Sequence, residues 1–365
     1  MNKKERFQAV RERKAPDFMP VWPRTMAQMI YGEGFMLPEV TGKDWYDSDK
    51  ITQAVLSSIK GVDYDLVIPT CYDRGLGVPV FGGTIDIPSK MGLAVGPIDW
   101  SFKSKADWPR IQKILARFDV RKTDPRMKGA LEVIKNVSRE VGDETPLVVV
   151  YTVATSVGMS HFRGNQAFLS DMTEDPEWVD EMCRVATDWT LDWIRAQYEA
   201  GANSVTCAGD GIGVALMSPE MAERFNLPSL CRVVEMVKKE FDQGVWYHLH
   251  GDFSKPNAYK YLTKLANEVG IEGFHFDQNN RSDWIKENVV EKLGKPACII
   301  IDGATIEEEP PEKIRQEVKN EISMIGDGLG IMMAPSCQLL PATSNENFKA
   351  WVDATHEYGT YPLQQ

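Results

Sequence analysis

The chain has 365 residues, of which 43% are hydrophobic and 26% are charged, and its formal net charge at pH 7 is −12. These proportions are ordinary for a soluble globular protein with a sizeable core. Because a phosphate backbone attracts a basic surface, the acidic balance argues against nucleic acid as a partner.

Cysteine usage and the distribution of apolar residues indicate the cellular compartment. The six cysteines are scattered without a C-x-x-C pair, which is typical of a reducing environment. The charged residues 1–6 are not followed by an apolar signal region, and no run approaches the ~20 apolar residues of a membrane helix. We therefore expect a cytoplasmic protein that does not enter a membrane.

Apolar runs and helical patterns alternate along the chain. The expected strands, in chain order, are 17–22, 65–69, 147–152, 203–207, 245–250, 272–276, 297–301 and 329–333. The expected helices are 3–13, 50–60, 106–117, 125–141, 175–200, 218–242, 256–268, 282–292, 311–325 and 345–358. A stretch rich in Gly and Pro at 75–97 predicts an elaborated loop or small hairpins after the second strand.

Eight strands that alternate with helices predict an α/β fold of the (β/α)8 TIM-barrel class, as a single domain over residues 1–365. The helix at 3–13 is an N-terminal helical extension that closes one end of the barrel. The alternative is a doubly wound open sheet. No G-x-G-x-x-G follows an early strand, and polar residues stand at every expected strand end, so the barrel is favoured.

In a barrel of this class, functional residues lie at the carboxyl ends of the strands, because all eight ends meet at one mouth. The polar residues and cysteines found there are Arg24, Cys71, Asp73, Thr155, Ser156, Asp210, His248, His250, Asp277, Gln278, Asn279, Asp302 and Cys337.

Two histidines one residue apart end the fifth strand. Since side chains alternate along a strand, His248 and His250 are expected on the same side, with Cα atoms about 6–7 Å apart. Barrel closure would bring Cys337 to them from the eighth strand. Two imidazoles, one thiolate and an open fourth position are the ligand count of a catalytic zinc site. The alternative is a hydrogen-bonded histidine pair beside a small buried cysteine.

Asp277, Asp210 and Arg24 are the candidates for catalytic residues at the same mouth. Asp277 would orient a ligand imidazole, bind substrate or act as an acid, and its alternative role is to cap the helix that begins near Ser282. Asp210 is equally well a turn residue, and Arg24 a member of a plain ion pair. His275 shares the face of Asp277, and a core histidine is favoured there.

Several short motifs carry a family resemblance through their order and spacing. They are Pro20-Val21-Trp22-x-Arg24, Tyr198-Glu199-Ala200-Gly201-Ala202, Leu216-x-Ser218-Pro219-Glu220, His248-Leu249-His250-Gly251-Asp252, Ala334-Pro335-Ser336-Cys337 and Asn345-x-Asn347-Phe348-Lys349-Ala350. Over nearly its full length the chain resembles the uroporphyrinogen decarboxylase superfamily, and in particular its corrinoid-dependent methyltransferase branch.

The resemblance implies a zinc site. Methyltransferases of the superfamily bind zinc through His-x-Cys after the fifth strand and Cys after the eighth. His248 and Cys337 match this pattern, and His250 stands where the pattern has Cys. A neutral imidazole in place of a thiolate makes zinc a stronger Lewis acid, which suits an oxygen- or nitrogen-bound methyl group. The decarboxylases hold their substrate with an arginine-rich run after the first strand, and only Arg24 stands there in this chain.

The resulting hypothesis is a zinc-dependent methyltransferase that transfers a methyl group from a small donor to Co(I). The donor is a methyl ether such as a methoxyaromatic, or secondly a methylamine or betaine. The corrinoid (cobalamin) would be carried by a partner protein, since no Asp-x-His-x-x-Gly signature occurs in this chain. A homodimer is compatible with this hypothesis.

Four alternative functions remain open at the level of sequence. They are methyl transfer from a methylcorrinoid to a thiol or tetrahydrofolate, uroporphyrinogen decarboxylation, zinc-dependent hydrolysis, and ligand binding without catalysis.

Overall fold

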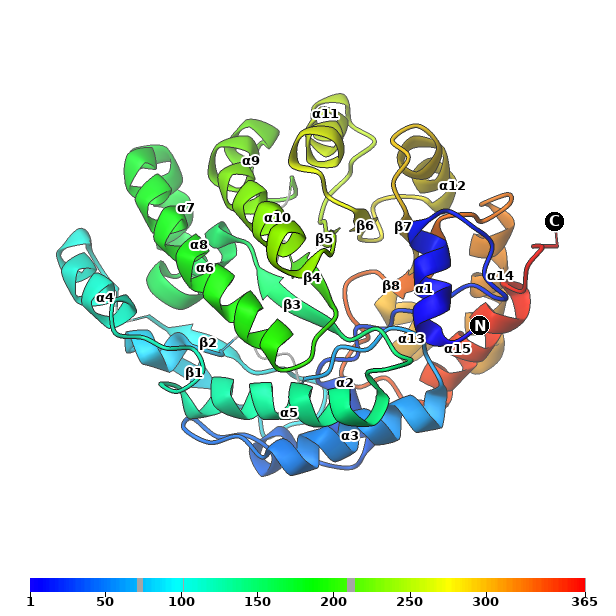
Figure 1. Cartoon of the computed structure of the whole chain (residues 1–365), viewed down its shortest axis with the longest axis horizontal. Helices are drawn as coiled ribbons and strands as arrows, with labels where there is room; N and C mark the ends of the chain where they lie inside the picture. The colour runs from blue at the N-terminus through cyan, green and yellow to red at the C-terminus, as the bar shows by residue number, and fades with distance from the viewer. Residues whose placement is uncertain (71–74, 101, 209–213, 365) are drawn as a thin grey trace.

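The computed structural model describes residues 1–70, 75–100, 102–208 and 214–364, and shows parallel strands enclosed by helices (Figure 1). Six strands pair in chain order, each parallel to the next. They are β3 (Val148–Thr152), β4 (Ser204–Ala208), β5 (Val245–His248), β6 (Gly273–His275), β7 (Ala297–Ile301) and β8 (Ile331–Pro335). Each lies within two residues of its expected range, and the strand side chains whose burial is described are buried, as strands covered on both faces require.

Two extended segments close this sheet into the predicted TIM barrel. Val21 makes a parallel bridge to Met333 in β8, and Val67 makes a parallel bridge to Leu147 beside β3. The two segments also contact each other, because Val21 O accepts hydrogen bonds from the amides of residues 65 and 66. The expected strands at 17–22 and 65–69 therefore occupy their places in the barrel, but as single bridges.

Prolines explain why these two segments are not full strands. Pro20, Pro23 and Pro69 lack the N–H group that a ladder hydrogen bond needs. Each segment therefore retains only the few backbone bonds that its other residues supply.

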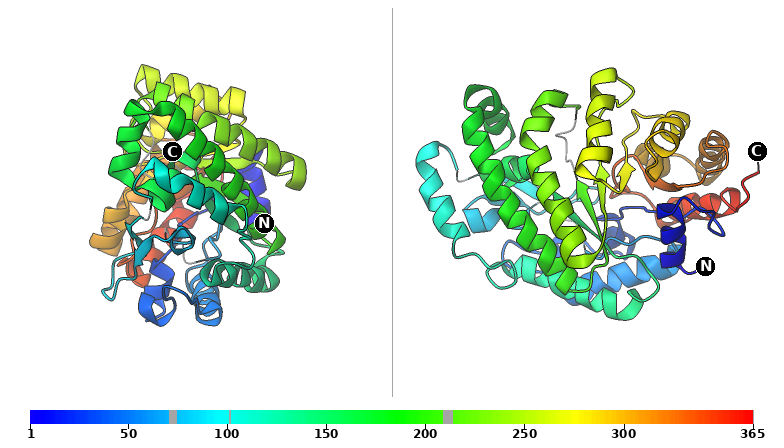
Figure 2. Two further views of the ribbon diagram at one scale, coloured as in Figure 1. Left: turned by 90° about the vertical axis from the view of Figure 1, so that its left-hand side faces the viewer. Right: turned by 45° about the horizontal axis from the view of Figure 1, so that its top comes forward.

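The helices lie outside the strands (Figure 2). In chain order they are α1 (Lys3–Arg11), α2 (Gln28–Gly32), α3 (Ser48–Val62), α4 (Trp108–Leu115), α5 (Pro125–Val141), α6 (Ala154–Val157), α7 (Asn165–Glu174), α8 (Pro176–Glu199), α9 (Pro219–Phe225), α10 (Leu227–Phe241), α11 (Pro256–Lys264), α12 (Ser282–Ile285), α13 (Gly303–Glu308), α14 (Pro311–Ser323) and α15 (Asn345–Tyr358). The short α2, α6, α7 and α13 were not expected from the sequence. Within the described ranges, every helix is too short or too polar to be a membrane-spanning segment.

Local sequence determines most helix boundaries. Helix α8 begins after Asp175, whose side chain accepts a hydrogen bond from Trp178 N, and Pro176 occupies its first position. The continuous helix expected over 218–242 is wrong, because α9 and α10 are separate and meet at Asn226. Pro228 lies in the first turn of α10, where it is tolerated, whereas inside one long helix it would remove a hydrogen bond.

The loop after the second segment contains a small antiparallel hairpin, as its turn-rich sequence predicts. Its strands are β1 (Thr84–Asp86) and β2 (Gly96–Asp99). Tyr31, in α2, donates a hydrogen bond from its hydroxyl to Leu93 O, at 2.8 Å. The hairpin connection thus lies against the segment that follows the first strand position.

Helix α1 crosses the amino ends of the strands, as expected. Lys4 N donates to Glu144 O ahead of β3, and Arg11 forms an ion pair with Glu272 ahead of β6. The Phe7 ring lies 5.6 Å from the Trp246 ring, centroid to centroid, near the start of β5. The opposite end of the barrel is left for the loops that follow the strands.

A buried carboxylate fastens α1 and α15 to this end of the barrel. Asp65 is fully buried and accepts hydrogen bonds from Val21 N at 2.9 Å, Arg6 Nη1 at 2.9 Å and His356 Nε2 at 3.0 Å. Phe18 lies between Arg6 and His356: the Arg6 guanidinium is 3.7 Å, and the centroid of the His356 ring 4.2 Å, from the centroid of the Phe18 ring. One side chain therefore joins both extended segments to the first and last helices.

We expect Asp65→Asn to lower the free energy of unfolding by about 3 kcal/mol, because the fully buried charge of Asp65 is lost and the partly buried Arg6 keeps only Asp17 as an ion-pair partner. The measurement is urea denaturation followed by circular dichroism. Asp63→Asn is the matched control: Asp63 is exposed and pairs with Lys3, so its substitution should change stability by less than about 1 kcal/mol. Equal stabilities for the two variants would contradict the role given to Asp65.

Candidate metal centre

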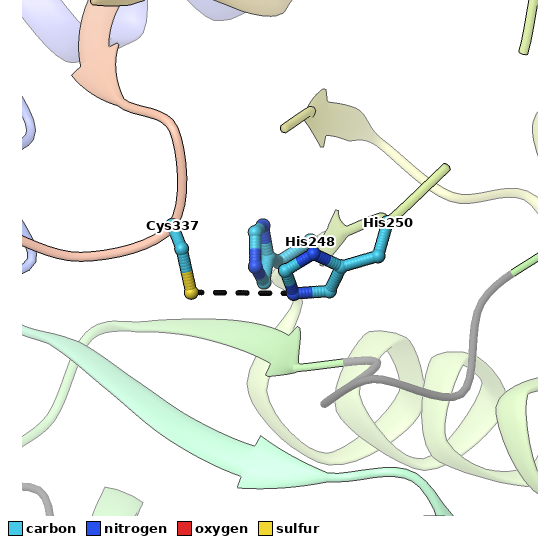
Figure 3. A group of neighbouring side chains, drawn as sticks. All are labelled: His248, His250 and Cys337. Carbon is cyan, nitrogen blue, oxygen red and sulfur yellow. Dashed lines mark hydrogen bonds between the residues drawn. The ribbon is translucent and has the colours of Figure 1, made fainter. Parts of the chain in front are cut away.

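The three residues expected to bind metal lie together at the carboxyl ends of β5 and β8. Strand β5 ends at His248, and His250 follows two residues later; β8 ends at Pro335, and Cys337 follows two residues later. Figure 3 shows Cys337 facing the two imidazoles. One ligand atom from each residue lies within 4.8 Å of the others.

His250 is held between a thiol and a carboxylate. Its Nε2 lies 4.0 Å from Cys337 Sγ, and its Nδ1 lies 3.6 Å from Asp277 Oδ2. Burial lowers the pKa of His250, but the hydrogen bonds and charges of Asp277 and Cys337 outweigh it and raise the pKa to about 9. The next residue, Gly251, has φ +113°, and a Cβ atom there would lie 2.7 Å from Val214 Cγ2. Only glycine allows this turn at such close approach.

Asp277 is an anchored carboxylate. Its oxygens accept hydrogen bonds from the amides of Gly251 and Asn279 and from the side chains of Asn279 and Asn280, at 2.8–3.1 Å. Burial raises its pKa, yet the hydrogen bonds from His250 and these neighbours leave the pKa below its ordinary value. The alternative helix-capping role is not seen, because the N-cap of α12 is Arg281.

His248 is fully buried, and both of its ring nitrogens lack a hydrogen-bond partner among the described residues. Its ring packs against two other imidazoles, at centroid distances of 4.4 Å to His250 and 4.5 Å to His275. Burial, followed by the charge of Arg24, moves the pKa of His248 well below its usual range. The ring is therefore neutral and has a free lone pair.

Arg24 and His275 form a buried pair behind His248. Arg24 Nη1 donates to His275 Nδ1 at 2.9 Å, and His275 Nε2 donates to Pro335 O at 2.7 Å. No carboxylate in the described part of the chain lies within 4.0 Å of the Arg24 guanidinium, so the plain ion pair is not observed there. The Arg24 backbone has φ +51°, a conformation that costs of order 1–3 kcal/mol in a residue other than glycine.

Thr155 and Asp302, which were also expected at the mouth, have partners outside the candidate metal centre. Thr155 donates from Oγ1 to Asn226 Oδ1 at 2.5 Å, so it holds the junction between α9 and α10. Ser156 is buried, and Asp302 caps α13 through Ala304 N. Three of the expected residues lie outside the described ranges: Cys71, Asp73 and Asp210.

Sequence reasoning missed two contributors to this centre. Asn280 donates from Nδ2 to Gly251 O at 2.8 Å and accepts from Phe253 N, so it shapes the loop that carries His250. The available signal was the Asn279-Asn280 pair, which begins two residues after Asp277. His275 was placed in the core, where it lies, but its contact with His248 was not foreseen.

The donor set fits a zinc ion. Bond lengths of about 2.0–2.3 Å in a tetrahedral site place ligand atoms about 3.3–3.8 Å apart, so the observed group needs only a small contraction. The two unpartnered nitrogens of buried His248 are what a ligand without its ion would show. Asp277 supplies the carboxylate that commonly supports a metal-bound histidine.

The chain matches the family described as uroporphyrinogen decarboxylase (URO-D) over residues 2–358. It is 24% identical to a uroporphyrinogen decarboxylase of Pseudoalteromonas atlantica over 98% of this chain and 97% of that protein. It is 22% identical to the methylcobamide:CoM methyltransferase MtbA of Methanosarcina acetivorans over 62% of this chain, and it spans 63% of that relative's length.

A solved structure extends the likeness to the fold. A methyltransferase from Methanosarcina mazei superposes with a TM-score of 0.79 and 20% identity, covering 98% of this chain and 99% of that one. The family match covers nearly all of the barrel, including both strand ends that carry the candidate ligands. The chain therefore belongs to the uroporphyrinogen decarboxylase family.

Proposed function

We propose that this protein is a zinc-dependent methyltransferase that transfers a methyl group from a small donor to the Co(I) of a corrinoid carried by a separate protein. The observation that supports this most is the convergence of His248, His250 and Cys337, with both nitrogens of His248 unpartnered in the described structure. The likeness to MtbA, a methylcobamide:CoM methyltransferase, adds support for corrinoid chemistry.

His248, His250 and Cys337 would hold the zinc ion. Zinc with three protein ligands supplies Lewis-acid polarisation of a donor oxygen or nitrogen at its fourth position. Asp277 orients His250 through Nδ1, so that Nε2 faces Cys337. The lowered pKa of Asp277 and its several hydrogen-bond donors favour this orienting role over proton donation.

Arg24 indicates which chemical class of methyl donor the site would bind. Its buried guanidinium makes one hydrogen bond among the described residues, to a neutral imidazole, and its Nε lacks a partner there. A buried cation that has no carboxylate partner in the described part of the chain is costly, and a substrate carboxylate would relieve that cost. This favours a methoxylated aromatic acid first and a betaine second, and it disfavours simple methylamines.

A second candidate function is methyl transfer in the opposite direction, from a methylcorrinoid to a thiol. The printed activity of the MtbA relative favours it. The replacement of a ligand cysteine by His250 favours the first direction, because fewer thiolates leave the zinc a stronger Lewis acid.

With zinc-loaded protein and Co(I) cobalamin, we expect methoxylated aromatic acids to give the visible absorption change of Co–CH3 formation. Their demethylated product should appear in equal amount. Cys337→Ser should abolish both signals, because it removes a ligand from the proposed centre. Rapid demethylation of methylcobalamin by a thiol, without any reaction of methyl ethers, would instead establish the second candidate.

Asp277→Asn should weaken zinc binding about 10- to 100-fold, because a supporting carboxylate of a metal-bound histidine is lost. Competition with a chromophoric chelator measures this affinity. Asp252→Asn is the control: Asp252 lies on the same loop and bonds Ser254. An unchanged zinc affinity in Asp277→Asn would show that Asp277 does not support the proposed centre.

Arg24→Met should raise KM for a carboxylated methyl ether about 10- to 100-fold, since a hydrogen bond between charged groups is lost. The KM for an uncharged methoxyaromatic should rise much less. Arg24→Lys retains the positive charge, so its KM for the carboxylated methyl ether should lie between those of the wild type and Arg24→Met. If Arg24→Met has normal zinc content and its KM rises equally for the carboxylated and the uncharged donor, carboxylate binding by Arg24 is contradicted.

A further inference from the structure

His275 lies between the two strand ends that carry the candidate metal ligands. It is the direct neighbour of His248 in the β5–β6 register, and Leu249 N donates to His275 O at 2.8 Å. Its Nε2 reaches Pro335 O at the end of β8, two residues before Cys337. One imidazole thus contacts both sides of the proposed centre.

The hydrogen bonds of His275 fix its tautomer. A guanidinium can only donate, so Nδ1 accepts from Arg24 and Nε2 carries the proton that goes to Pro335 O. Both nitrogens are engaged, and therefore His275 is not available as a fourth metal ligand. Its ring plane is determined by these two bonds on opposite sides.

The ring of His248 is oriented in an unusual way. A metal-bound histidine commonly donates its other N–H to a carboxylate or carbonyl, and this bond sets the ring orientation. His248 has no such bond in the described structure. Instead its face stacks on His275 with an interplanar angle of 30°, and the His250 ring meets it at 75°.

We propose that His275 is the positioning residue of the metal centre, holding the His248 ring by stacking and the strand end that bears Cys337 through Pro335 O. The two contacts set the separation between His248 and Cys337. This inference rests on the zinc centre of the proposed function, and His275 itself touches neither metal nor substrate.

Two substitutions test separately the stacking of His275 on His248 and its hydrogen bonds. His275→Gln retains an acceptor for Arg24 and a donor for Pro335 O, but it removes the stacked ring. His275→Phe retains a ring against His248 and removes both hydrogen bonds. If one of the variants fails to fold, the other still tests its own contact.

The experiment is cobalt(II) substitution of the full chain, with zinc affinity measured in parallel by chelator competition. Both variants should lose about 10- to 100-fold in zinc affinity. His275→Gln should alter the d–d bands and keep the thiolate-to-cobalt band, whereas His275→Phe should weaken the thiolate band because Cys337 is no longer held.

His356→Gln is the matched control, since His356 bonds Asp65 at the opposite end of the barrel. It should lower stability without changing either cobalt spectrum or zinc affinity. Unfolding measured in a chelator separates stability from metal binding. If the His275 variants have wild-type cobalt spectra and zinc affinity, the role of His275 is wrong but the proposed function stands. If the wild-type protein binds neither zinc nor cobalt, the proposed function is wrong as well.

Discussion

The candidate metal centre depends on the contact between β8 and the first extended segment. Trp22 N donates to Met333 O, and Met333 N donates to Pro20 O, both at 2.9 Å. These bonds close the sheet, so the end of β8 faces the end of β5. In a flat sheet the two strands would be three spacings apart, about 14 Å, whereas the candidate ligand atoms lie within 4.8 Å of each other.

Opposite charges flank the two imidazoles of this centre. Asp277 lies beside His250, and Arg24 lies behind His248 through His275. Asp277 and Cys337 raise the pKa of His250 to about 9, whereas burial, followed by the charge of Arg24, moves the pKa of His248 well below its usual range. Metal binding at the proposed centre would therefore release a proton from His250 at neutral pH, whereas His248 would bind in its neutral form.

The sequence predicted those parts of the structure that depend on local chemistry or on barrel topology. The start of α5 is predictable from Asp124 and Pro125, since a capping carboxylate and a proline at N1 are local signals of a helix start. The convergence of His248, His250 and Cys337 followed from the single assumption of a closed barrel.

The parts that were missed depend on contacts between distant residues. The link from Arg24 through His275 to Pro335 O joins three strand positions, and no periodicity or spacing in the sequence encodes it. The backbone of Arg24 at φ +51° has no sequence signal either, because arginine rarely adopts that conformation. The prolines near Val21 and Val67, by contrast, are a local sequence signal for the weak strand pairing seen there.

The bridge between Val21 and Met333 also has a consequence for biosynthesis. The barrel cannot close on the ribosome before β8 has been made, because the first segment pairs with a strand that lies far along the chain. Until then its apolar edges are exposed, and His248 has no thiol partner. In the proposed centre, all three metal ligands would therefore come together only after β8 has been made.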